Sequence, residues 1–84
     1  MYRLQQNIIL DPDDCSVIID SLSNKYYELN EVSQLIVIGI MKGMDLEAIV
    51  NDICSKFEIG RDRCFADCEE FVQILVENHI VIKK

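Results

Sequence analysis

The cysteines of this chain are the side chains best suited to bind a metal or act as nucleophiles. Cys64 and Cys68 stand four residues apart on an expected helix, so both thiols lie on one face. No C-x-x-C pair accompanies them, and the single histidine, His79, follows eleven residues after Cys68. Structural zinc usually takes four soft ligands at recognisable spacings, so we expect no metal and no other cofactor. With no secretory signal, reduced thiols in the core are favoured over disulfides that would also involve Cys15 and Cys54.

The remaining reactive residues do not combine into an active site. The sequence has no nucleophile paired with a base and no glycine-rich phosphate loop. The carboxylate pairs Asp13-Asp14 and Glu69-Glu70 are interpreted as solvated surface. His79 is interpreted as a residue at a helix end, where its charge would favour the terminal carbonyls. The sequence therefore predicts a protein that is not an enzyme.

Length and charge limit the function further. The chain has 84 residues, 50% of them hydrophobic, which is enough for a single domain over residues 1–84. A net charge of −7 argues against nucleic-acid binding, because phosphate neutralisation needs clustered Lys and Arg and the eight present are scattered. The longest apolar run, 35–41, is far shorter than the roughly 20 residues of a membrane span. We expect a cytoplasmic protein that binds neither nucleic acid nor membrane.

Turn-forming and helix-capping residues divide the chain into strands and helices. Residues 11–14 and 21–24 are rich in Asp, Pro, Ser and Asn, which predicts turns between strands. Asn30, Asp45 and Asp62 are the expected helix N-caps. The predicted elements are strands 2–10, 15–20 and 25–29, a helix 31–42, a helix from the Asp45 cap to 57, a helix 62–78, and a strand 79–84. This order predicts an α+β, winged-helix-like fold with an N-terminal three-stranded antiparallel β-sheet, a three-helix bundle and a short C-terminal strand.

The third helix would be the recognition helix if this fold bound DNA. Its core stripe is predicted to be Phe65, Cys68, Val72 and Leu75, with Cys64, Phe71 and Val76 at the edges. Its polar positions carry five carboxylates against a single arginine, Arg63. That many carboxylates would repel phosphate, so this helix is not expected to bind DNA.

One face of the same helix has the pattern of a peptide-binding groove. Asp67, Glu70, Ile74 and Glu77 follow one another at spacings of three and four, with Phe71 at the margin. Ile74 and Phe71 could hold apolar side chains of a ligand, and Asp67 and Glu70 could hold its Lys or Arg. A single exposed isoleucine is also common on ordinary protein surfaces, which is the alternative interpretation.

The strand 25–29 would form the second wall of such a groove. At a sheet edge, its main-chain groups could pair with an incoming strand. Alternation places Tyr26 and Glu28 on one face and Lys25, Tyr27 and Leu29 on the other, and we expect Tyr27 and Leu29 to face the core. The alternative is that both tyrosines simply cover the sheet, with Lys25 and Glu28 protecting its edge.

Several segments together match a known family. They are VIID at 17–20, NKYYELN at 24–30, the apolar helix that ends in MKG at 41–43, LEAIVNDICSKFEI at 46–59, and Asp67-Cys68 with Phe71 and Leu75. In this combination the chain resembles the PqqD-like family, the precursor-peptide recognition elements of pathways that make ribosomally synthesised and modified peptides. Cys68 stands where such proteins often have Val, a change that is compatible with packing.

The resemblance implies a non-catalytic domain that binds the leader region of a precursor peptide. The leader would add as a strand to residues 25–29 and pack on helix 62–78. The implied peptide-binding residues are Lys25, Tyr26, Tyr27, Glu28, Leu29, Asp67, Glu70, Phe71 and Ile74. Asn30, at the family's LN junction, is assigned a structural capping role.

The resemblance also implies partners. Freestanding copies of about this length are similar to the leader-binding subunit of lasso-peptide systems, which work with a cysteine protease that removes the leader and an ATP-dependent cyclase. One alternative is a PqqD-type chaperone that presents a precursor to a radical SAM enzyme. The other is a small acidic winged-helix scaffold that binds a folded protein rather than a peptide.

Overall fold

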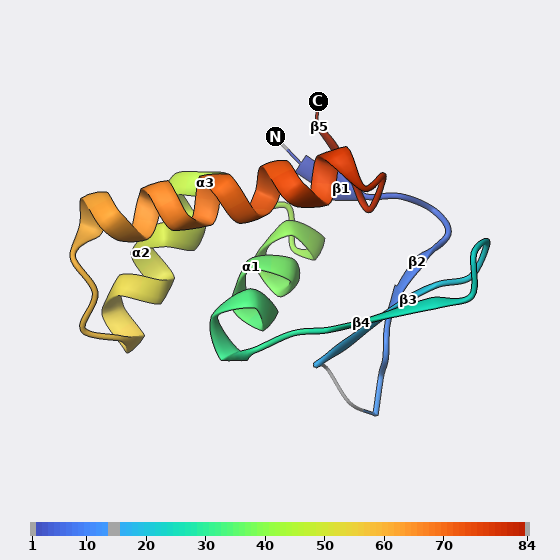
Figure 1. The fold of residues 1–84 in the computed structure, drawn as a ribbon. Coiled ribbons are helices and arrows are strands. Elements are labelled where there is room, and N and C mark those ends of the chain that lie inside the picture. The colour runs from blue at the N-terminus through green and yellow to red at the C-terminus, as the bar shows by residue number, and fades with distance from the viewer. Residues whose placement is uncertain (1, 14–15, 84) are drawn as a thin grey trace.

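The computed structural model describes residues 2–13 and 16–83, which form two small sheets and three helices (Figure 1). The N-terminal half holds four strands and the C-terminal half holds most of the helical residues. In chain order the elements are β1 (Tyr2–Leu4), β2 (Ile8–Leu10), β3 (Val17–Asp20), β4 (Lys25–Glu28), α1 (Glu31–Met41), α2 (Leu46–Lys56), α3 (Arg61–Glu77) and β5 (Val81–Lys83). The predicted α+β class, three-stranded antiparallel sheet, three helices and C-terminal strand are therefore confirmed.

The expectation of one continuous strand over residues 2–10 is wrong. Residues 2–10 contain two strands in different sheets: β1 pairs with β5, and β2 joins the antiparallel sheet β2-β3-β4. The chain turns between them, where the Ile8 amide donates to the Gln5 carbonyl at 3.1 Å. The Asn7 side-chain amide then donates to the Asp20 carboxylate at 2.8 Å, which ties this turn to the end of β3. The loose alternation of residues 2–10 reflects this break.

Asp20 also organises the hairpin turn that leads into β4. Its carboxylate accepts from the amides of Leu22 at 3.1 Å and Ser23 at 3.3 Å. These bonds favour the charged carboxylate and, with the Asn7 bond first, lower the pKa of Asp20. The turn continues through Asn24 at φ 56°, a left-handed conformation that Asn tolerates better than most residues. The hairpin predicted at 21–24 is thereby confirmed.

Two of the three predicted helix caps are confirmed. The Asn30 side chain accepts from the Ser33 amide, and the Asp45 side chain accepts from the Ala48 amide, each at 2.8 Å. The third prediction is wrong, because α3 begins at Arg61 and its N-cap is Gly60, which has no side chain to cap with. Asp62 instead lies in the first turn, where its charge interacts favourably with the helix dipole.

The C-terminal strand is shorter than predicted, because residues 79 and 80 complete the end of α3. The His79 amide donates to the Val76 carbonyl at 3.1 Å, and the Ile80 amide donates to the Leu75 carbonyl at 2.9 Å. This is the Schellman arrangement, and His79 occupies its left-handed position at φ 60°. The second predicted strand is also shorter, since β3 begins at Val17, and Asp14 and Cys15 lie outside the described residues.

The core lies where the helices meet one another and the inner faces of the sheets. On α3 the buried residues are Cys64, Cys68, Val72 and Leu75, whereas Phe65 is only half-buried. The prediction that placed Phe65 in the core and Cys64 at its edge is therefore wrong. Both residues lie near the start of α3, where the smaller Cys64 interacts with Cys54 of α2. Elsewhere on α3 the predicted stripe is confirmed.

Gly39 is required where α1 approaches α2. A Cβ atom added at this position would lie 2.6 Å from Cγ1 of the Ile49 side chain, which is fully buried. We predict that Gly39→Ala destabilises the fold by about 1–3 kcal/mol through overpacking, even though Ala is the better helix former. Urea denaturation of both proteins measures this difference.

Gly60→Ala is the matched control, because no atom lies within 4 Å of the added methyl group. Its cost should stay below about 1 kcal/mol, the typical effect of a poorer N-cap residue. Equal losses for the two variants would contradict the packing role of Gly39.

Candidate functional site

Strand β4 is an edge of the three-stranded sheet and directs half of its main-chain groups outward. The Leu29 amide donates to the Ser16 carbonyl at 2.6 Å, so these opposed residues form a hydrogen-bonded pair. Hydrogen-bonded and non-bonded pairs alternate along an antiparallel ladder. Tyr27 therefore pairs with β3, whereas the N–H and C=O groups of Tyr26 and Glu28 point away from β3. An incoming strand would meet the main-chain groups of these two residues.

The side chains of β4 alternate as the sequence predicts. Leu29 is buried and Tyr27 packs half-buried against the core. Tyr26 and Glu28 are on the other face, and Tyr26 is 69% exposed. The choice of Tyr27 and Leu29 as the inward residues is confirmed. Lys25 is exposed near the hairpin turn.

An apolar hollow, here called the β4 hollow, separates β4 from α3. Its volume is about 160 Å³. Tyr27, Glu28 and Leu29 form its strand wall, and Phe71, Ile74 and neighbouring α3 residues form its helix wall. The complete lining is Ile18, Tyr27, Glu28, Leu29, Phe71, Ile74, Leu75, Asn78 and Ile80. Strand and helix therefore face each other across a space that side chains of a ligand can enter.

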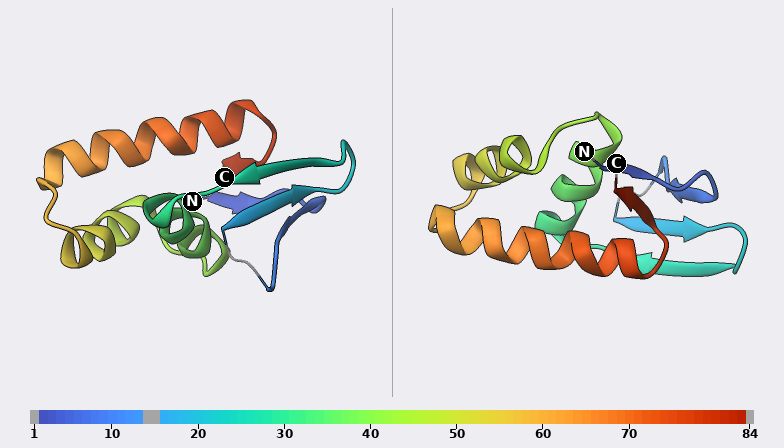
Figure 2. Two further views of the ribbon diagram at one scale, coloured as in Figure 1. Left: turned by 60° about the horizontal axis from the view of Figure 1, so that its bottom comes forward. Right: turned by 90° about the horizontal axis from the view of Figure 1, so that it is seen from above.

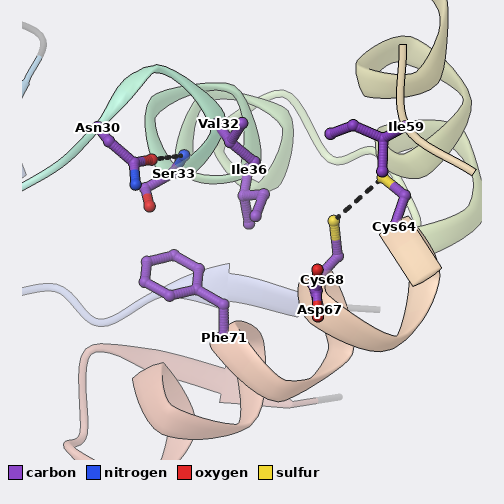
Figure 3. Close-up of a pocket in the computed structure, with 9 residues that line it drawn as sticks. All are labelled: Asn30, Val32, Ser33, Ile36, Ile59, Cys64, Asp67, Cys68 and Phe71. Atoms are coloured by element: carbon purple, nitrogen blue, oxygen red, sulfur yellow. Dashed lines mark hydrogen bonds between the residues drawn. The ribbon is translucent and has the colours of Figure 1, made fainter. Parts of the chain in front are cut away.

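A second hollow, here called the α1 hollow, lies between the N-terminal turns of α1 and the first half of α3 (Figure 3). Its volume is about 230 Å³, and it is lined by Asn30, Val32, Ser33, Ile36, Ile59, Cys64, Asp67, Cys68 and Phe71. The Phe71 ring extends from α3 toward α1 in Figure 3. Because Phe71 lines both hollows, they adjoin along α3. We call the two hollows together the groove.

The cysteines at the far end of the α1 hollow form part of the core. The sulfur atoms of Cys64 and Cys68 are 3.9 Å apart, and both residues are 2% exposed. Burial raises the pKa of the Cys64 thiol to about 12 and also raises the pKa of Cys68. Both thiols are therefore protonated at neutral pH, and a thiol in this state is a poor nucleophile. Within residues 2–13 and 16–83, no three His, Cys, Asp or Glu side chains are grouped to hold a metal ion.

The groove brings together six of the nine predicted peptide-binding residues, and the other three lie elsewhere. The six are Tyr27, Glu28, Leu29, Asp67, Phe71 and Ile74. Glu70 lines a neighbouring hollow with Tyr2 and Lys83, which shares Ile74 with the β4 hollow. Lys25 lines another near the hairpin turn, which shares Tyr27 with the β4 hollow. Tyr26 lines neither hollow of the groove, and its main-chain groups face the open edge of β4.

Asp67 is the carboxylate at the mouth of the α1 hollow. Its charge lies 3.8 Å from the Arg63 guanidinium, and both side chains are largely exposed, at 66% and 84%. An exposed pair of this kind contributes little to stability, so Asp67 is free to exchange Arg63 for a cation of a ligand.

The α1 wall of the groove was not predicted from the sequence. Val32 and Ser33 line the α1 hollow, as does Asn30, which was assigned only a capping role. A signal for them was present, because α1 follows β4 after only two residues and its first turn must therefore lie beside that strand. Ile59, in the loop before α3, carried no comparable signal.

Comparison with known proteins shows the family of the chain. The chain belongs to the PqqD family: the family model described as coenzyme PQQ synthesis protein D (PqqD) matches residues 7–81. No curated protein matches the chain.

Two solved structures have the same fold. Lasso peptide synthetase B1 complexed with the leader peptide is 25% identical, with a TM-score of 0.86 over 98% of both chains. TbiB1 in complex with the TbiA(beta) leader peptide is 18% identical, with a TM-score of 0.87 over 98% of this chain and 96% of that one.

No helix in the described part of the chain is long and apolar enough to cross a membrane.

Proposed function

We propose that this protein binds the leader region of a ribosomally synthesised precursor peptide as an extended strand added to β4. The observation that carries this proposal is the outward main chain of Tyr26 and Glu28 at a sheet edge that faces an apolar groove. Main-chain pairing would provide affinity, and the hollows would select alternate side chains. Both solved structures described above are complexes with a leader peptide, which supports the same occupant here.

The groove favours a leader with apolar residues at alternate positions. In a strand paired with β4, every second side chain would point to the same side as Tyr27 and Leu29, toward α3. One such side chain would enter the β4 hollow between Tyr27 and Ile74, and the α1 hollow beyond Phe71 would take another. Asp67 would hold a Lys or Arg of the leader at the mouth of the α1 hollow.

The predicted residues outside the groove would have secondary roles. Tyr26 would contribute main-chain bonds and cover the added strand from its exposed face. Lys25 and Glu70 would contact only leader segments that continue beyond the groove, near the hairpin turn and along the outer face of α3. Their substitution should therefore change leader affinity less than substitution of Phe71 or Ile74.

The role proposed for the bound state is delivery without catalysis, in the cytoplasm. Holding the leader on this domain raises the effective concentration of the precursor near an enzyme that modifies it. A lasso-peptide pathway is favoured, with a leader-removing cysteine protease and an ATP-dependent cyclase as partners, because both similar solved structures carry leader peptides and one is a lasso peptide synthetase. The alternative partner is a radical SAM enzyme, in keeping with the family description as a coenzyme PQQ synthesis protein.

Titration of a labelled leader from the precursor of the same gene cluster tests the proposal. We expect saturable binding, with the largest amide shifts in NMR spectra at residues 25–30 and along α3. A leader of the same composition in scrambled order is the control and should not compete. Absence of binding, or shifts confined to α2 and β5, would contradict the proposed function.

A further inference from the structure

The outer face of the three-stranded sheet carries an apolar row that the groove does not use. Ile9, Ile19 and Tyr26 are direct neighbours across the strands, since Ile9 pairs with Ile19 and Ile19 with Tyr26. Their side chains alternate with those of Ile8, Ile18 and Tyr27, which face the core. We call Ile9, Ile19 and Tyr26 the outer row.

The outer row is accessible rather than part of the core. Ile9 is 48% exposed and Tyr26 69%, and Ile19 between them is half-buried. The hairpin end of β3 and β4 extends beyond the helices in all views of Figures 1 and 2. Antiparallel sheets with one solvated face normally place polar residues there, so an apolar row across three strands indicates a surface that another molecule covers.

We propose that the outer row is the docking face for the enzyme that modifies the bound precursor, and that this enzyme contacts it through an apolar patch bordered by Lys and Arg. Charge supports this occupant. Glu28 lies on the same face, two residues beyond Tyr26, and exposed Asp13 follows β2. A second copy of the chain would place a net charge of −7 against an equal charge, and the two would repel each other. A partner with Lys and Arg around its apolar patch would instead complement the acidic residues of this face.

The outer row is continuous with the proposed leader site, and to that extent this inference rests on the proposed function. A leader strand added to β4 would extend the same sheet, and its outward side chains would lie beside Tyr26. The enzyme would then contact three strands of the domain and one strand of its own substrate on one surface. Leader-loaded protein should therefore bind the enzyme more tightly than the leader-free protein.

Ile9→Lys tests the docking face without disturbing the groove. Ile9 is on β2, with β3 and β4 between it and the strand edge that would bind the leader. The protease and the cyclase, or the corresponding modifying enzyme, of the same gene cluster are each purified and titrated with the full chain, with and without leader. For at least one enzyme, Ile9→Lys should weaken binding about 20-fold, because an apolar contact is lost and a cation meets a basic border. Its leader affinity should stay within about twofold of the wild type, since the groove is intact.

Met41→Lys is the control, because Met41 is 54% exposed and is the last residue of α1, outside the three-stranded sheet. It should bind enzyme and leader as the wild type does. Equal enzyme affinity of Ile9→Lys and the wild type would overturn the proposal, as would failure of every enzyme to bind the leader-loaded protein. Sedimentation showing a wild-type dimer that Ile9→Lys dissociates would instead assign the row to self-association. If the leader itself does not bind, the proposed function fails, and titration of the leader-free chain still decides whether Ile9 contacts an enzyme.

Discussion

Replacing Ile74 by Glu is expected to weaken leader binding about 30-fold or more, because burial of an Ile side chain contributes roughly 1.5–3 kcal/mol and a buried carboxylate adds a desolvation cost. Ile74 is 46% exposed in the free protein and lies on the helix wall of the β4 hollow, so a bound peptide would cover the rest of it. Titration of labelled leader into both proteins measures the difference.

The fold should tolerate this substitution. Ile74 lies off the buried stripe of α3, and Glu is a good helix former. The new carboxylate is within one helical turn of Glu70 and Glu77, a like-charge arrangement that costs a few tenths of a kcal/mol. The urea midpoint should therefore change little.

Met41→Glu is the matched control for Ile74→Glu. Met41 is similarly exposed, at 54%, and it lines neither hollow of the groove. It adds the same charge to the chain, so a general effect of net charge on leader affinity would appear in both variants. Unchanged affinity of Ile74→Glu, with its fold intact, would remove the α3 wall from the proposed site.

The elements that the sequence predicted well are those whose signals are local. Asn30 and Asp45 cap helices through bonds to residues only three positions away, so the sequence contains both partners. The alternation that buries Leu29 and exposes Tyr26 follows in the same way from the period of a strand.

The errors arose where distant residues decide the structure. The break between β1 and β2 depends on the bond from Asn7 to Asp20, thirteen residues away, and on the pairing of β1 with β5 at the other end of the chain. The exchange of Phe65 and Cys64 depends on the contact between Cys64 and Cys54 of α2, ten residues away in the sequence. The helical period shows which residues form a stripe, but at the end of a helix it does not decide which of two neighbouring residues faces the core.

The geometry of the candidate site, too, was predicted correctly where the signal is local and incorrectly where distant elements decide. Spacing along α3 placed Asp67, Phe71 and Ile74 on a common side, and they do line the groove. The same spacing included Glu70, which lines only the hollow against Tyr2 and Lys83, whereas Ile74 lines both that hollow and the groove. A helix face is wide enough to border two hollows, and only the positions of β1, β4 and β5 decide which residues belong to each.

Main-chain pairing at β4 leads to the second large expected effect, and Tyr26→Pro tests it. Proline has no N–H group, and at position 26 that group points away from β3 toward the open edge. The bonds between β4 and β3 therefore remain, since they use residues 25, 27 and 29. An edge strand tolerates proline in this orientation. A bound leader would lose one hydrogen bond and would leave its own carbonyl unpaired, a cost of about 1–3 kcal/mol.

Tyr26→Ala separates this effect from loss of the side chain. Both variants remove the phenol ring, and only the proline also removes the N–H group, so the ratio of their leader affinities isolates the main-chain contribution. We expect Tyr26→Pro to bind leader at least about 10-fold more weakly than Tyr26→Ala, the ratio that about 1.4 kcal/mol produces. Amide shifts of β3 residues report whether the β3-β4 pairing persists in the proline variant. Equal affinities with that pairing intact would mean that the leader does not add to β4 as a strand, and that its binding depends on contacts with the hollows alone.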